Sequence, residues 1–111
     1  MYKISAAYLG GENAHFDFDY YFRVHVPLAE KQMRLGNVPY VKREVARNSQ
    51  DFFDRAMPGP VLVLSYYLES KSDVDAFRAF SNTPLVQPLF EDVPNYTNCK
   101  LVWSIAEVEE L

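Results

Sequence analysis

The sequence predicts an α+β fold in which two β-α-β halves share one antiparallel sheet. Runs of apolar and alternating residues indicate four strands, two stretches have helical spacing, and Gly, Pro and Asn separate them. The order β-α-β-β-α-β is that of the ferredoxin-like plait, with both helices on one face of the sheet. The chain of 111 residues is expected to form one such domain, residues 1–111. The expected strands are Tyr2–Leu9, Val38–Arg47, Val61–Glu69 and Cys99–Val108.

The first helix is expected to follow a Gly10-Gly11 turn and the loop Glu12–His15, to include the stretch Phe16–Gln32 and to end near Leu35-Gly36. Asp17 suits the N-cap, and the spacing of Phe16 and Tyr21 is that of a hydrophobic staple. Gly36 is expected to take a left-handed conformation at the end of the helix. The apolar face comprises Phe18, Tyr21, Phe22, His25, Leu28, Ala29 and Gln32.

Pro27 interrupts this helix. A proline inside a helix removes one backbone hydrogen bond and costs roughly 3 kcal/mol. It leaves the carbonyl of Arg23 without its partner, so the sequence predicts a kink just after His25.

The middle of the chain is expected to contain an edge strand, a long connection and the start of the second helix. Val38–Arg47 alternates in its second half, which is typical of a half-solvated edge strand. The long connection Asn48–Pro60 carries Phe52 and Phe53 and is interpreted as a lid, a partner-contact arm or a mobile loop. Ser72, with Asp75 three residues later, is expected to cap the second helix.

A second, shorter helical turn is expected at Thr83-Pro84, with Thr83 as its cap. A turn-rich stretch, Asp92–Asn98, then leads to the last strand.

The strands also predict a partner. The third strand is apolar on both faces, with Val61 and Val63 on one face and Leu62 and Leu64 on the other. An apolar sheet face that no helix covers usually marks an interface. The expected cover is a second copy of the chain, related by a two-fold axis.

Composition excludes several functions. The net charge of −4 provides no basic field for nucleic acid or an anionic membrane, and no apolar run is long enough to span a bilayer. Cys99 is the single cysteine, which excludes an internal disulfide and a cysteine metal cluster. A soluble, cytoplasmic protein is expected.

His25 is the candidate for chemistry, because it lies on the apolar face of the first helix and imidazole titrates near neutrality. It would act as a general acid/base, bind a metal or polarise a substrate oxygen. The alternative is a buried histidine that hydrogen-bonds a backbone carbonyl. His15 is expected at the surface, and two histidines without a carboxylate cluster predict no metal site.

Aromatic residues supply the candidate binding residues. Tyr66, Tyr67 and Trp103 line a pocket in one interpretation and fill the core or an interface in the other. Tyr96 and Asn95 either reach the cleft or only stabilise their turn. Cys99 is expected to be a packed, unreactive thiol, and nucleotide-binding and hydrolase motifs are absent.

Two segments resemble the signature stretches of the EthD (ethyl tert-butyl ether degradation) family, which belongs to the dimeric α/β-barrel superfamily. These segments are F-D-F-D-Y-Y-F-R-V-H-V-P-L (Phe16–Leu28) and D-V-P-N-Y-T-N (Asp92–Asn98). The resemblance extends to M-Y-K-I-S and P-x-V-L-V-L-S-Y-Y, and it accounts for Pro27, since H-x-P-L is a family pattern. It implies a homodimer whose two sheets form a shared barrel.

The resemblance also implies a function. Members of the wider superfamily include cofactor-free monooxygenases, lactone isomerases, polyketide cyclases and haem-binding enzymes, and in several the ligand lies between the helices and the sheet. We therefore expect a small cofactor-independent enzyme that acts on an apolar metabolite, with His25 as acid/base and no cofactor or metal. The alternative is a non-catalytic binding or accessory protein for a hydrophobic metabolite or a partner oxygenase. The expected substrate-binding residues are Tyr21, Tyr67, Asn95, Tyr96 and Trp103.

Overall fold

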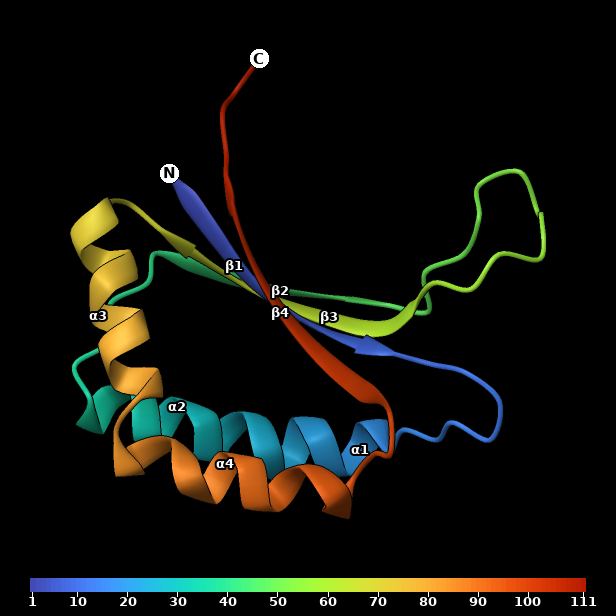
Figure 1. Ribbon diagram of the computed structural model, residues 1–111, viewed down its shortest axis with the longest axis horizontal. Helices are drawn as coiled ribbons and strands as arrows, with labels where there is room; N and C mark the ends of the chain where they lie inside the picture. The colour runs from blue at the N-terminus through green and yellow to red at the C-terminus, as the bar shows by residue number, and fades with distance from the viewer.

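The computed structural model describes residues 1–111 and confirms the ferredoxin-like plait (Figure 1). Four antiparallel strands form one sheet in the order β2-β3-β1-β4. No helix is long and apolar enough to cross a membrane. The strands are β1 (Tyr2–Leu9), β2 (Lys42–Arg47), β3 (Pro60–Leu68) and β4 (Lys100–Glu107).

The helical segments cover one face of this sheet, the face that carries the buried residues Ile4, Ala6, Leu62 and Leu64. The helix α4 lies beside the long first helical segment, and α3 covers the other end of the layer (Figure 1). The segments are α1 (Phe18–Tyr20), a π-helix (Tyr21–His25), α2 (Val26–Leu35), α3 (Lys71–Ser81), a 3₁₀ turn (Pro84–Val86), α4 (Gln87–Asp92) and a second 3₁₀ turn (Val93–Asn95).

The start of the first helix is as predicted. The Asp17 carboxylate accepts a hydrogen bond from the Tyr20 amide at 3.0 Å, and the rings of Phe16 and Tyr21 lie 5.2 Å apart. The effect of Pro27 differs from the predicted kink after His25. One widened, π-helical turn precedes the proline, and the Val26 amide donates to the Tyr21 carbonyl five residues earlier. Such a turn changes the hydrogen-bonding register without breaking the helix.

Two predicted helix ends are wrong. Gly36 has an ordinary φ of −87°, and Asn37 is the left-handed residue with φ 54°. Glycine is nevertheless required at 36, since a Cβ there would lie 2.6 Å from the Phe80 ring. The second helix begins earlier than predicted, because Ser70 rather than Ser72 accepts from the backbone amide three residues on.

The second strand is shorter than the predicted Val38–Arg47. The Val38 amide donates to the Met33 carbonyl and so closes the end of α2, while Pro39 has no amide to donate. Regular pairing with β3 therefore begins at Lys42. The strand is an exposed edge, as its alternation predicts. The short turn at Thr83-Pro84 is confirmed, with the Thr83 hydroxyl as its cap.

The connection between β2 and β3 extends away from the body of the molecule (Figure 1). Phe52 and Phe53 on this segment are 89% and 74% exposed. The Asp51 carboxylate organises the segment locally, because it accepts from the Phe53 and Arg55 amides and pairs with the Arg55 guanidinium. Its role as lid or partner-contact arm stays a prediction.

The sheet face away from the helices has one apolar row that crosses all four strands. Strand register places Ala46, Val63, Ala7 and Val102 side by side across the sheet. The next row consists of Glu44, Ser65, Ser5 and Ser104. Most side chains of these two rows are small, and the serine row makes this face more polar than predicted.

Candidate functional site

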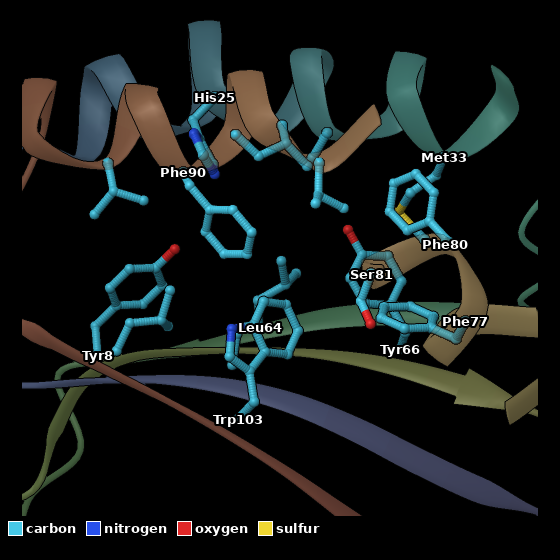
Figure 2. A pocket seen from close by; sticks show the side chains of 16 residues that line it. Tyr8, His25, Met33, Leu64, Tyr66, Phe77, Phe80, Ser81, Phe90 and Trp103 are labelled. Atoms are coloured by element: carbon cyan, nitrogen blue, oxygen red, sulfur yellow. The ribbon is translucent and has the colours of Figure 1, made fainter. Parts of the chain in front are cut away.

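A cavity of about 340 Å³ lies between the helices and the sheet (Figure 2). Its walls come from every layer of the fold: β1, β3 and β4 below, and α2, α3 and α4 above. The lining residues are Ala6, Tyr8, His25, Ala29, Met33, Leu64, Tyr66, Phe77, Phe80, Ser81, Val86, Leu89, Phe90, Val93, Leu101 and Trp103.

The lining is almost wholly apolar. Of its 16 residues 14 are hydrophobic, and His25 and Ser81 are the two exceptions. No lysine, arginine or carboxylate faces the cavity. A charged ligand would therefore lose its hydration without gaining a partner, so the cavity suits a neutral, apolar molecule.

His25 enters this cavity from the π-helical turn (Figure 2). Its Nδ1 atom lies 2.9 Å from Oδ2 of Asp92, the last residue of α4. The imidazole also packs between the rings of Tyr21 and Tyr96, at centroid distances of 5.5 and 4.6 Å. With Nδ1 engaged by the carboxylate, Nε2 is the nitrogen left for a ligand.

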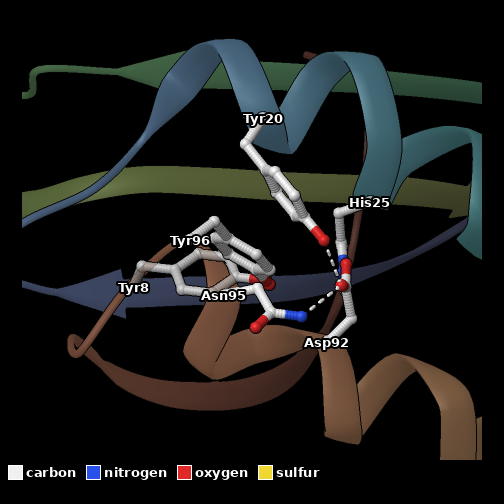
Figure 3. A network of polar contacts seen from close by, with 6 residues as sticks. All are labelled: Tyr8, Tyr20, His25, Asp92, Asn95 and Tyr96. Atoms are coloured by element: carbon white, nitrogen blue, oxygen red, sulfur yellow. Dashed lines mark hydrogen bonds and ion pairs between the residues drawn. The ribbon is translucent and has the colours of Figure 1, made fainter.

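Asp92 is itself held in place by two further side chains (Figure 3). The Tyr20 hydroxyl donates to its Oδ1 at 2.5 Å, and the Asn95 amide donates to the same oxygen at 3.1 Å. Asn95 belongs to the 3₁₀ turn that follows α4 directly. Oδ1 of Asp92 therefore accepts from Tyr20 and Asn95, whereas Oδ2 binds His25.

The electrostatics of this pair favour a neutral imidazole. Burial lowers the pKa of His25 below its ordinary value, although the Asp92 carboxylate acts in the opposite direction. Burial tends to raise the pKa of Asp92, but hydrogen bonds from Tyr20, Asn95 and His25 together lower it. A charged carboxylate beside a neutral histidine places the proton on Nδ1, which leaves Nε2 with a free lone pair.

A group of three tyrosines adjoins the imidazole. The hydroxyls of Tyr8 and Tyr96 lie 2.6 Å apart, and the Tyr21 hydroxyl is buried without a hydrogen-bond partner. Burial raises the pKa of all three hydroxyls, most strongly at Tyr8 and Tyr21. These groups therefore stay protonated and keep their capacity to donate.

The structure brings only part of the predicted set to the cavity. His25 and Trp103 line it. Tyr96 is fully buried behind the histidine, and Asn95 contacts Asp92 rather than the cavity. The alternative interpretation gave His25 a backbone-carbonyl partner, but its Nδ1 faces the Asp92 carboxylate.

Two of the predicted binding residues lie elsewhere. Tyr21 is a fully buried core residue that does not line the cavity. Tyr67 lies on the opposite face of the sheet, because side chains alternate along β3, and its hydroxyl donates to Glu44 at 2.6 Å. Its neighbour Tyr66 is the tyrosine that faces the helices and lines the cavity.

Sequence reasoning missed Asp92 and Tyr8. Asp92 lies 67 positions from His25, and the sequence around it indicates only a turn. The resemblance to the EthD family could have identified Asp92, since His25 lies in one of the two signature segments and Asp92 in the other. Tyr8 lies in the predicted first strand, and its sequence context does not distinguish it from other apolar strand residues.

Metal-binding capacity is low at this site. No three His, Cys, Asp or Glu side chains are grouped so that they could hold a metal ion. His15 is exposed in a loop, where its carbonyl accepts from Thr97, and Cys99 is buried.

Comparison with known proteins shows the fold. A crystal structure of an EthD-like protein from Ralstonia eutropha JMP134 has a TM-score of 0.68 and 24% sequence identity over 98% of this chain and 94% of that chain. The fold is that of the EthD-type proteins. An EthD family protein from Bacillus halodurans C-125 matches it with a TM-score of 0.61 and 21% identity, over 98% of this chain and 99% of that chain. The similarity to EthD that the two segments indicate is thus confirmed in structure.

A more distant structure is that of a dimeric ferredoxin-like protein of unknown function from Jannaschia sp. CCS1. It matches with a TM-score of 0.51 and 15% identity, over 97% of this chain and 100% of that chain. No protein-family model and no curated protein matches the sequence.

Proposed function

We propose that this protein is a small enzyme that binds a neutral, apolar metabolite between its helices and sheet and uses His25 as a general acid/base. One observation carries the proposal: Asp92 binds Nδ1 of a buried imidazole that lines an apolar cavity. A histidine oriented in this way by a carboxylate is suited to proton transfer.

The proposed proton transfer uses the neutral and the protonated forms of His25 beside the Asp92 carboxylate. In the resting state His25 is neutral and Nε2 accepts a proton from the substrate. The imidazolium that forms lies against the Asp92 carboxylate, which stabilises it. The apolar walls exclude water and strengthen this interaction. Isomerisation, cyclisation, elimination and assisted oxidation all include such a step.

We also propose that the protein is a homodimer. The sheet face with the apolar row Ala46, Val63, Ala7 and Val102 supports this proposal, because a second copy can pack against it across a two-fold axis. The dimeric state of the ferredoxin-like protein from Jannaschia gives further support. In such a pair the two sheets would form the shared barrel. The single domain, the cytoplasmic location and a link to ether degradation stay predictions.

The test of the acid/base function uses the wild-type protein and His25→Gln in D₂O with a panel of neutral lactones, ketones and enones. Proton NMR measures deuterium incorporation and product formation. We expect wild type to act on at least one compound and His25→Gln to be at least about 100-fold slower, the usual contribution of a general acid/base. Equal rates in the two proteins would contradict the proposal.

A second candidate is a non-catalytic binding or accessory protein for a hydrophobic molecule. The observation in its favour is the lining itself, in which 14 of 16 residues are hydrophobic. A binding protein would not need the imidazole of His25. In that case His25→Gln would keep the wild-type affinity for a neutral dye such as Nile red, and wild type would turn over none of the compounds.

A further inference from the structure

The cavity between the helices and the sheet reaches the surface at the β4 edge. Most of its lining residues are buried, but the large rings of Phe90 and Trp103 are 52% and 49% exposed. Phe90 extends from α4 toward the sheet, and Trp103 extends from β4 toward the helices (Figure 2). Because β4 is the outermost strand and α4 has only six residues, the outer sides of these rings are left uncovered.

An open hollow on the surface continues the cavity at this point. It is lined by Phe90, Val93, Pro94, Leu101 and Trp103. All of these residues except Pro94 also line the cavity, so the two spaces are contiguous. None of the five is charged, and the indole N–H of Trp103 is the one polar side-chain group. A continuous apolar path therefore leads from His25 inside the cavity to Pro94 at the surface.

The proposed homodimer would leave this hollow open. Val102 pairs with Ala7 in the apolar row on the sheet face away from the helices. Trp103 pairs with Ala6, which faces the helices, because side chains alternate along a strand. A second copy packed on the Ala7 row therefore covers the opposite side of β4. The hollow stays free for the part of a ligand that extends out of the cavity.

We propose that this hollow is a binding subsite for the apolar tail of a substrate whose reactive end lies beside His25. The substrate class is then an elongated, neutral molecule with a compact reactive head and a hydrocarbon tail. The inference rests on the proposed acid/base function, because that function places the reactive end at His25.

The size of the cavity supports a ligand in two parts. Its volume of about 340 Å³ lies near the lower end of the range of roughly 300–1,000 Å³ that is usual for ligand pockets. The cavity suits a compact head, and a longer molecule gains by using the hollow. A hydrocarbon tail there would cover the exposed sides of Phe90 and Trp103, and a fully buried methylene raises affinity about fourfold.

A different hollow adjoins Trp103 on the side of α3, but it is less suited to a hydrocarbon tail. Its lining includes Arg78, Ser81 and Ser104. An alkyl chain there would remove water from polar groups without replacing their hydrogen bonds. The tail is therefore expected to follow α4 toward Pro94.

Two lactones with the same head test the inference: γ-hexalactone carries an ethyl tail and γ-dodecalactone an octyl tail. Isothermal titration calorimetry gives their affinities for wild type, Pro94→Asp and the control Pro88→Asp. Both prolines lie at the start of a helical turn, but Pro88 lines neither the cavity nor the hollow. Circular dichroism and the affinity for γ-hexalactone show whether each variant keeps its fold and its cavity.

We expect γ-hexalactone to bind all three proteins equally. The affinity for γ-dodecalactone should fall at least about tenfold in Pro94→Asp and stay unchanged in Pro88→Asp, because a carboxylate beside the tail loses hydration. Trp103 is the single tryptophan, so its fluorescence gives a second measurement on wild type alone. Bound γ-dodecalactone should protect Trp103 from acrylamide quenching more strongly than bound γ-hexalactone does.

The outcomes separate this inference from the proposed function. If neither lactone binds wild type, the neutral-ligand function is overturned and the subsite with it. If both bind but Pro94→Asp treats the two tails as wild type does, or the octyl tail gives Trp103 no added protection, only the subsite is overturned. Protection of Trp103 that grows with protein concentration in the absence of lactone would assign the hollow to a second copy of the chain and overturn the subsite as well.

Discussion

Nδ1 of His25 and Oδ2 of Asp92 lie 2.9 Å apart, although 67 positions separate the two residues in the chain. The contact joins the π-helical turn of the first helix to the last residue of α4. It converts a histidine on an apolar helix face into an oriented, polarised group. Tyr20 and Asn95 hold the carboxylate from its other oxygen (Figure 3).

The first prediction concerns this contact. Asp92→Asn keeps the shape of the side chain but removes the charge that selects the Nδ1-protonated tautomer. We expect His25-dependent proton exchange to fall by at least about tenfold, because the imidazolium loses its counter-charge. Proton NMR gives the rate, and ¹⁵N NMR of the ring reports the tautomer. Asn95→Ala, which removes one support of the carboxylate, should cause a smaller loss. An unchanged rate in Asp92→Asn would show that the carboxylate has no part in the reaction.

The second prediction concerns pH. Because burial lowers the pKa of His25 in the folded protein, the unfolded chain binds a proton there more readily. The free energy of unfolding should therefore decrease as the pH falls below about 6.5, the ordinary histidine value. It should level off below the lowered pKa. Above about 6.5 both states are neutral at this residue, and no dependence from His25 is expected.

Urea denaturation at pH 7.5, 6.5 and 5.5 measures this dependence. His25→Gln should flatten the decrease in this range, whereas His15→Gln, at an exposed loop position, should retain it. Asp92 acts at lower pH, since its lowered pKa makes its contribution disappear only below about 3.8. A wild-type decrease that persists in His25→Gln would assign it to another group.

The third prediction compares two apolar side chains. Leu62 is fully buried in the core, and Phe52 is 89% exposed on the β2–β3 connection. Leu62→Ala should lower the free energy of unfolding by about 2–5 kcal/mol, through lost burial and the cavity left behind. Phe52→Ala should change it by less than about 0.5 kcal/mol. Urea denaturation decides, and a large loss from Phe52→Ala would mean that this ring packs against a partner in solution.

The fourth prediction tests the homodimer. Ala7 lies in the middle of the apolar row, between Val63 and Val102, on the sheet face away from the helices. Ala7→Glu would bury an unpaired charge in a sheet-to-sheet interface and should raise the dimer dissociation constant at least about a hundredfold. Sedimentation equilibrium measures the constant. Ala79→Glu, the same change at an exposed site on α3, should leave it unaltered. A dimer that tolerates Ala7→Glu must use another face.

Local chemistry was enough to predict most of the fold. The strand periodicity located β1, β3 and β4 to within one residue at each end, and Asp17 and Thr83 were identified as caps. The errors arose where neighbouring groups compete for one role. Ser70 and Ser72 both suit an N-cap, and Gly36 and Asn37 both suit a left-handed turn. Which of each pair is used depends on how α2 and α3 pack, for example on the Phe80 ring against Gly36.

Some features of the candidate site can likewise be predicted from the sequence, and others depend on the packing of the chain. Spacing within one segment is enough to predict that His25 lies on an apolar helix face and that Pro27 disturbs the helix beside it. The packing of the whole chain is needed to bring Asp92 to His25, to turn Tyr66 rather than Tyr67 toward the cavity, and to place Tyr8 in its lining. The physical reason is range: hydrogen bonding and hydrophobic periodicity act over a few residues, whereas the docking of α4 beside the first helix is a property of the whole packed chain.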